Sequence, residues 1–304
     1  MTFNQLRTFV EVATAGSVIE AATALTVSPP AVSAAVGSIE KELGIQLVER
    51  AGRGLVITPA GVVFARYARQ VLALLETGKA ATAEALDPER GQVRLAAVTT
   101  AGEHVVPRFL ASFRDRHPQA GITLEVGNRD RVWEALEDHE ADLAVGGRPP
   151  GGGRFVTLAT RPNVLVLVAA GTGTPSVREV DMDTLSRSVV LLREGGSGTR
   201  GTAEELLDEL GVDPPTLTLG SNGAIRESVQ VGLGITLISR DAVARELDEG
   251  TLQEWRCAGI PRQRAWHVVA RANEHLPATA GLFLTHLVGA GAGGFTLVRE
   301  ASPG

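Results

Sequence analysis

The stretch SPPAVSAAVGSIEKELG, residues 28–44, decides how the N-terminal part of this chain folds. Its apolar residues recur at helical spacing and fall within about 60° of arc at 3.6 residues per turn. They are Val32, Val36, Ile39 and Leu43. Ser28 is the candidate N-cap, and proline is tolerated in the first turn of a helix. The pattern predicts a helix with one buried stripe.

The opposite face of this predicted helix is small rather than charged, because residues 28–40 contain no Arg or Lys. That face consists of Pro30, Ser33, Ala34, Gly37, Ser38 and Lys41. A packing helix made of small residues is one interpretation. In the other, the backbone approaches a grooved partner closely, alanine methyls contact thymine methyls, and serine hydroxyls bond to base edges or phosphates.

Two shorter helical patterns precede this stretch. The first includes Leu6 and Phe9 and stops at Ala15-Gly16, where Gly supplies a helix exit. The second is VIEAATAL (18–25), with Ser17 placed to cap it. A break of about four residues, Thr26 to Pro29, then leads to the third helix and contains Ser28. Two helices, a tight turn and a third helix with a free face predict a helix-turn-helix.

The segment QLVERAGRGLVITPAG, residues 46–61, adds a hairpin signal. Two short apolar runs flank a turn containing Gly, which predicts a wing, and Arg50 and Arg53 supply positive charge that the third helix lacks. Residues 1–90 nevertheless hold eight basic and nine acidic side chains, a balance of −1. Phosphate neutralisation dominates DNA affinity, so a monomer should bind weakly and a dimer should double the contacts.

The chain from Pro59 to Leu86 lacks a breaker except Gly61 and Gly78, and Asp87-Pro88 ends it. A coiled-coil-like seam runs along this long helix. We expect the dimerisation residues to be Phe64, Tyr67, Ala68, Val71, Leu74 and Leu75. The alternative is a helix packed on its own domain.

Bulk composition sets broader limits. The 304 residues suggest two or three domains, and the net charge of −6 gives no hint of a nucleic-acid partner. The single Cys257 rules out an internal disulfide and fits a reducing compartment. Without a signal-like segment or an apolar run of membrane-spanning length, we expect a cytoplasmic protein that is not bound to membrane.

Beyond residue 92, strand and helix patterns alternate, which predicts a parallel sheet with crossover helices. Ligands of such sheets bind where strands end and helices begin. The candidate effector-binding residues at these junctions are Thr99, Thr100, Ala101, Gly147, Arg148, Ser197, Gly198, Thr199, Arg200 and Asn222. The helix start within REGGSGTRGTAEEL (193–206) would attract an anionic group. Alternatively, Thr202 and Glu205 form a capping box that satisfies the same N–H groups.

Catalytic patterns are not readable in this sequence. There is no Ser-His-Asp arrangement, no Cys/His metal spacing and no P-loop lysine after the glycines, so we expect neither an enzyme nor a metal or cofactor site. His104 and His267 are most simply structural, and Trp133 is a core or subunit-contact residue.

The motif from Leu6 to Gly61 resembles the winged helix-turn-helix of the LysR-type transcriptional regulators. Ser28, Pro30 and Ser33 match the family pattern. Pro29 stands where the family usually has Gln, and the positions of Ala34, Ala35, Gly37 and Ser38 are usually basic or amide. The resemblance therefore implies the DNA-binding fold, whereas the residues at these positions do not support the base contacts that are usual in the family.

The resemblance also implies the domain plan. It gives a winged helix-turn-helix at 1–58, a linker and dimerisation helix at 59–86, a hinge at 87–92 and an effector-binding region at 93–304. That region would be a periplasmic-binding-protein-like pair of α/β subdomains, the first from 93–162 and 267–290 and the second from 163–266. The stretch from Thr99 to Pro150, with GNR and GRPP, is similar to the subgroup that controls CO2-fixation operons.

The expected function is a regulator whose promoter binding changes when a small molecule, such as an anionic metabolite, enters the cleft between the subdomains. Its partners would be double-stranded promoter DNA, further copies of itself in a dimer or tetramer, the effector and RNA polymerase. Two alternatives stay open. One is a solute receptor or enzyme built on the α/β region, and the other is a DNA-binding repressor that needs no ligand.

Overall fold

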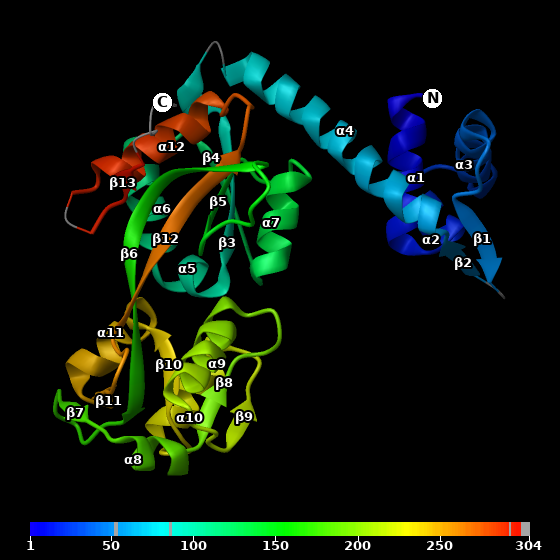
Figure 1. Cartoon of the computed structure of the whole chain (residues 1–304). Coiled ribbons are helices and arrows are strands. Elements are labelled where there is room, and N and C mark those ends of the chain that lie inside the picture. The colour runs from blue at the N-terminus through cyan, green and yellow to red at the C-terminus, as the bar shows by residue number, and fades with distance from the viewer. Residues whose placement is uncertain (52–53, 85–86, 292, 299–304) are drawn as a thin grey trace. The chain divides into compact units, whose positions relative to one another are not determined.

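The computed structural model describes residues 1–51, 54–84, 87–291 and 293–298 (Figure 1). It divides into two compact units, each with its own apolar core. One is Met1–Ala83 with Glu137–Glu140, and the other is Glu84–Leu136 with Ala141–Gly304. Arg53 and residues 85–86 of the predicted linker helix lie outside the described residues, as does the side chain of Arg50.

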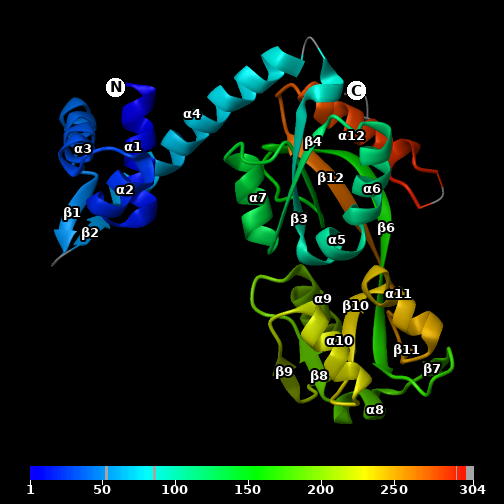
Figure 2. The ribbon, with the colours of Figure 1, turned by 180° about the vertical axis from the view of Figure 1, so that it is seen from behind.

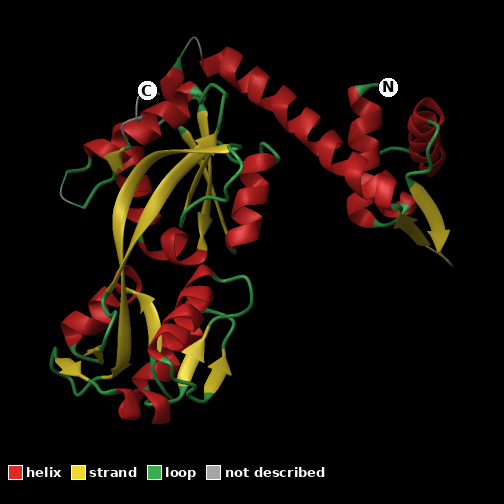
Figure 3. Cartoon of the chain, in the orientation of Figure 1, coloured by secondary structure: helices red, strands yellow, loops and turns green. Residues whose placement is uncertain are grey.

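Three short helices build the N-terminal unit: α1 (Phe3–Ala15), α2 (Val18–Leu25) and α3 (Pro29–Leu43) (Figure 3). Gly16 ends α1 in the left-handed conformation, and the Ser17 hydroxyl accepts a bond from the backbone N–H of Glu20. The axes of α2 and α3 bend by 107° at the turn between them. Consecutive helices at about 90–120° are the mark of a helix-turn-helix, as the sequence predicted.

The buried stripe of α3 is shorter than the sequence predicted. Val32, Val36 and Ile39 are buried with Phe9 in one cluster, whereas Leu43 is 39% exposed. Leu43 is the last helical residue before Gly44, whose left-handed conformation turns the chain away. Helix ends leave the last side chain beyond the contact with neighbouring helices, so periodicity alone overstated the stripe.

The predicted wing is present as a hairpin of β1 (Val48–Ala51) and β2 (Gly54–Ile57), in which Val48 pairs with Ile57. The Glu40 carboxylate on α3 accepts bonds from the backbone N–H groups of Leu47 and Val48, at 2.8 and 3.1 Å. This contact fixes the hairpin to α3. Helix α4 (Pro59–Glu84) follows directly.

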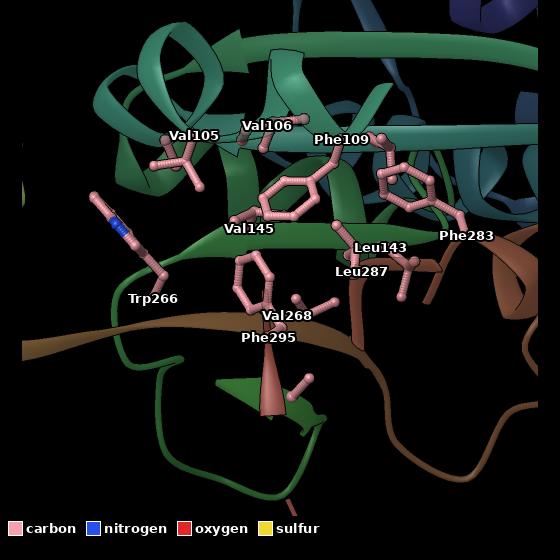
Figure 4. Close-up of a cluster of buried hydrophobic side chains, with 14 of the residues drawn as sticks. Val105, Val106, Phe109, Leu143, Val145, Trp266, Val268, Phe283, Leu287 and Phe295 are labelled. Carbon is pink, nitrogen blue, oxygen red and sulfur yellow. The ribbon is translucent and has the colours of Figure 1, made fainter. Parts of the chain in front are cut away.

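The first subdomain of the second unit has a three-strand parallel section, with β3 (Gln92–Val98) between β4 (Gly121–Gly127) and β5 (Leu143–Gly146). The helices of this subdomain are α5 (Thr99–His104), α6 (Val106–Arg116), α7 (Arg129–Glu137) and α12 (Ala278–Gly289), after a 3-10 turn, η1 (Pro88–Arg90). Figure 4 shows Phe109, Phe283 and Leu287 in its apolar core.

The second subdomain is formed mainly by the chain segment that joins two long strands, β6 (Phe155–Ala170) and β12 (Arg262–Arg271). These two strands run side by side between the subdomains (Figures 1 and 2). Its strands are β7 (Val177–Glu179), β8 (Val190–Leu192), β9 (Thr216–Thr218), β10 (Thr236–Ser239) and β11 (Leu252–Arg256). Its helices are α8 (Met182–Arg187), α9 (Gly198–Leu210), α10 (Asn222–Gln230) and α11 (Arg240–Glu249).

The predicted parallel sheet is present in β3, β4 and β5, but the sheet continues with antiparallel strands that the sequence did not predict. Strand β12 is antiparallel to both β5 and β6, and β10 and β11 are antiparallel to β6. The reason is that β6 carries the chain out of the first subdomain and β12 brings it back. The predicted crossing points near residues 163 and 267 fall within these two strands.

The segment after Val288 has structure that the sequence did not predict. Strand β13 (Thr296–Leu297) pairs with β6, and Phe295 is buried with its ring 5.7 Å from that of Phe109. A single aromatic anchor after a glycine-rich run gives no periodic signal, so this part of the core could not be predicted.

Candidate DNA-binding face and effector pocket

The small face of α3 is open in the N-terminal unit. Every described residue predicted to touch DNA is exposed: Ser28, Pro30, Ser33, Ala34, Gly37, Ser38 and Lys41. A Cβ at Gly37 would meet no atom within 4 Å. The buried stripe holds the opposite side of α3, so the free face can approach a groove without disturbing the core.

One member of this face has a partner in its own domain. The amide nitrogen Nε2 of Gln5 on α1 donates to the Ser38 hydroxyl at 3.0 Å, and Gln5 also closes a capping box with Thr2. Ser38 can still donate its own hydroxyl proton. Ser28 stands at the N-cap of α3, as expected, but its side chain makes no capping bond. Its hydroxyl is therefore not used within the helix.

Helix α4 carries an exposed apolar strip. Tyr67 and Leu74 are each 54% exposed, and Val71 is 44% exposed. Phe64 lies elsewhere: its ring is 5.3 Å from that of Phe9, in the core of the N-terminal unit. Of the remaining residues expected at a dimer seam, Ala68 is buried and Leu75 is half-buried.

In the second unit, a small pocket lies where several strands end and helices begin, with a volume of about 10 Å³, which is room for about one water molecule. It is lined by Thr199, Arg200 and Asn222 from the expected set, and by Arg193 and Thr236, which sequence reasoning missed. Aliphatic side chains of β8, β10, α9 and α10 form the rest. A mostly apolar lining with a few polar groups is also found in small-molecule sites.

A chain of hydrogen bonds joins this pocket to the first subdomain. Arg193 is buried directly after β8, and its Nη1 donates to Asn222 Oδ1 at 2.5 Å. Asn222 Nδ2 in turn donates to the hydroxyl of Thr100, on α5, at 2.9 Å. Asn222 therefore bridges a residue of each subdomain. A ligand that changes this bridge would change how the subdomains are held.

The Arg193 guanidinium is also paired with its neighbour Glu194. Its Nε and Nη2 donate to the two carboxylate oxygens of Glu194, both at 2.7 Å. These bonds from Arg193 lower the pKa of the Glu194 carboxyl, so it stays ionised. The site thus holds a buried cation with a neighbouring anion.

Helix α9 begins at Gly198, with Ser197 as an N-cap that makes no side-chain capping bond. The alternative capping box is wrong, because Thr202 and Glu205 lie a full turn inside the helix. Thr202 donates to Gly198 O, and Glu205 accepts a bond from Arg264. The first N–H groups of α9 are consequently not satisfied by these side chains.

The other expected effector residues are dispersed. Ala101 packs in the core of the first subdomain, which excludes its side chain from the cleft. Thr99 donates to Gly127 O at 3.3 Å. Arg200 lines the pocket, but its guanidinium is engaged by Glu204, Thr218 and the Arg193 carbonyl.

The GNR and GRPP motifs meet at the edge of the first subdomain. Arg129 Nη2 donates to the carbonyl of Arg148 at 3.1 Å, and Arg148 is exposed beside the half-buried Gly147. A Cβ at Gly196 would lie 3.9 Å from Asn128 Nδ2, which brings the glycine-rich loop before α9 close to the GNR motif. His267 lies nearby, and burial first, then the charge of Arg148, lower its pKa.

The described residues include no group of three or more His, Cys, Asp or Glu side chains able to hold a metal ion. No single helix among them is long and apolar enough to cross a membrane. One bent pair passes by length and composition alone, and that pair is α2 with α3 of the helix-turn-helix.

Comparison with known proteins agrees with this geometry. Residues 3–62 match the bacterial regulatory helix-turn-helix protein model of the lysR family, and residues 86–292 match the LysR substrate binding domain. The chain belongs to the LysR family of transcriptional regulators. It is a DNA-binding regulator with an effector-binding domain rather than an enzyme.

This LysR regulator is 33% identical to the RuBisCO operon transcriptional regulator of Acidithiobacillus ferrooxidans over 296 residues, 96% of this chain and 95% of that protein. The regulatory domain of Synechocystis PCC6803 CcmR in complex with 2-PG is 28% identical, with a TM-score of 0.59. It covers 66% of this chain and 96% of its own. CbnR in complex with its target DNA shares the fold, at 22% identity and a TM-score of 0.68, over 94% of this chain and 98% of that chain.

Proposed function

We propose that this LysR regulator is a cytoplasmic protein that controls carbon-fixation genes, and that its effector is a small phosphorylated metabolite. The relative from Acidithiobacillus ferrooxidans is named for the RuBisCO operon, and the CcmR domain holds 2-PG, which is 2-phosphoglycolate. In the proposed mechanism two copies grip an inverted repeat through α3, assisted by Lys41, Arg50 and Arg53. The bound protein then acts on RNA polymerase.

The observation that carries the effector class is the buried Arg193 at the end of β8. A buried guanidinium favours ligands with several acceptor oxygens, because charge-assisted bonds to phosphate are about twice as strong as neutral ones. Thr199 lines the same pocket, and the uncapped start of α9 lies beside it. Helix N-termini also favour negative charge. The lining therefore suits an anion better than a neutral or cationic ligand.

The mechanism of response would use the Asn222 bridge. A phosphate bonded to Arg193 competes with Asn222 Oδ1 for Nη1, and release of Asn222 frees Thr100 on α5. The two subdomains then settle at a different angle about β6 and β12. A hinge motion of this kind is a common way to change the spacing of paired DNA-binding domains.

Isothermal titration of the full-length protein with 2-phosphoglycolate tests the proposal. We expect binding by the wild type and at least about tenfold weaker binding by Arg193→Met, since hydrogen bonds to charged groups contribute about 1.5–3 kcal/mol. Arg187→Met is the matched control, because it removes the same charge from an arginine that is 78% exposed on α8. Equal binding by Arg193→Met and the control would contradict the proposed site.

The effect on DNA is measured separately. The wild type should change its affinity for promoter DNA, or the length of DNA that it protects, when 2-phosphoglycolate is added. DNA binding that is identical with and without saturating ligand would mean that the pocket is not coupled to gene control.

A further inference from the structure

Glu194 occupies the hydrogen-bond donors of Arg193 that an anionic ligand would use. Its two carboxylate oxygens accept from Nε and Nη2 of Arg193, while Asn222 accepts from Nη1. All three nitrogens of the buried guanidinium are thus engaged within the protein. We propose that Glu194 is a built-in counter-anion, which an effector has to displace from Arg193, and that this displacement weakens every anionic ligand by the same factor, so that only a strongly bonded anion is held. The inference rests on the proposed anionic effector.

The two partners differ in their freedom to move. The Arg193 side chain is 6% exposed, whereas that of Glu194 is 35% exposed. The buried guanidinium of Arg193 is shielded from water and depends on a neighbouring anion, so it stays in place. The Glu194 carboxylate, in contrast, can rotate into the solvent at small cost. Displacement therefore moves Glu194 and leaves Arg193 for the ligand.

Exchange of one anion for another sets a threshold for binding. A ligand carboxylate that replaces the Glu194 carboxylate forms the same two bonds with the same charge, and gains little. A phosphate group carries a charge of about −1.5 to −2 at pH 7 and three acceptor oxygens. It can bond to Arg193 and still reach Thr199 or the start of α9. Glu194 thus sets a threshold that a phosphate exceeds and a carboxylate does not.

A second explanation makes a different prediction. If Glu194 stays on Arg193 and merely repels anions, its removal helps the more highly charged ligand most, since Coulomb repulsion scales with charge. If Glu194 is displaced, its removal strengthens both ligands by a similar factor, because both are spared the same displacement cost. The ratio of the two affinities separates these cases.

The test compares 2-phosphoglycolate with diglycolate, in which a carboxymethyl group replaces the phosphoryl group on the same oxygen. Calorimetric Kd values for both are measured with the full-length wild type, Glu194→Gln and the control Asp183→Asn. The control removes an equal charge from a carboxylate that is 68% exposed on α8. Glu194→Gln should bind both ligands at least about tenfold more tightly, and the ratio of their two Kd values should stay close to that of the wild type. Asp183→Asn should keep both wild-type Kd values.

Unchanged Kd values in Glu194→Gln, or an increased preference for 2-phosphoglycolate, would overturn the displacement role and leave the proposed effector class intact. Absence of 2-phosphoglycolate binding by the wild type would instead refute the effector class, and the displacement role with it. If Glu194→Gln does not fold, Glu194→Asp replaces it. The shorter carboxylate reaches Arg193 less well, so both ligands should bind more tightly by a smaller factor, and unchanged Kd values would again overturn the role.

Discussion

A carboxylate placed on the small face of α3 tests whether this face meets DNA. Ala34 lies in the middle of the exposed face. Ala34→Glu should leave the fold intact, since exposed substitutions away from special features usually change stability by less than about 0.5 kcal/mol. The new charge would point at the phosphates and base edges of a DNA groove.

The size of the effect follows from Coulomb's law. A carboxylate about 6 Å from one phosphate, at an effective dielectric constant of about 40, is repelled by about 1.4 kcal/mol. That energy is a factor of about ten in Kd. In a dimer with one such contact per copy, the two factors multiply, and we expect about a hundredfold weaker binding.

Fluorescence anisotropy at one fixed salt concentration measures this loss, because Kd for DNA depends steeply on salt. The DNA is a fragment selected by the wild type from a random library. Ala244→Glu is the matched control: it makes the same change on an exposed alanine of α11 in the second unit. If Ala34→Glu binds within about twofold of the wild type and melts at the same temperature, α3 is not the DNA-binding element.

Two further predictions concern stability. A Cβ at Gly61 would lie 2.1 Å from the carbonyl oxygen of Leu47, so Gly61→Ala should lower the free energy of unfolding by about 1–3 kcal/mol in urea denaturation. Gly78→Ala on the same helix is the control, because a Cβ there would meet no atom within 4 Å. Equal free energies of unfolding for the two variants would contradict the close approach. Burial lowers the pKa of His286 below its ordinary value of 6.5, and the charges of Arg116 and His117 lower it further. The unfolded chain therefore binds the proton more readily, and the free energy of unfolding should fall as pH drops below about 6.5. His286→Gln should lose less stability than the wild type between pH 7.5 and 5, and an unchanged pH profile would exclude His286 as a contributor.

Local signals made the N-terminal unit predictable from the sequence. The stripe of Val32, Val36 and Ile39, the cap at Ser17 and the exit at Gly16 each depend on residues within one or two turns. Helix periodicity and capping are local effects, so one sequence suffices to detect them. The exposure of Leu43, in contrast, depends on where the neighbouring helices end, which is a property of the tertiary structure.

The effector pocket was predicted only in part, for a related reason. Thr100, Arg193 and Asn222 are far apart in the sequence and meet only because β3, β8 and β9 end at neighbouring places. The glycine-rich loop drew attention to Thr199 and Arg200. The signal for Arg193 was present as a single cation directly after the apolar run VVLL (189–192), which marks the end of a buried strand. A charge in that position has to find a partner, and Glu194 follows it immediately.

The DNA-binding face and the effector pocket make opposite use of charge, and this difference explains how one could control the other. Lys41 is the only cation on the small face of α3, so a single domain gains little from phosphate contacts. Specific binding then depends on two copies engaging together, and a linked pair loses its avidity when the spacing of its modules no longer fits the two sites. The pocket, in contrast, concentrates charge on Arg193, where in the proposed mechanism a bound phosphate releases Asn222 and so moves the two subdomains. A DNA-binding face with a single cation, combined with such a charged pocket, would let a small change of angle decide whether the regulator holds its promoter.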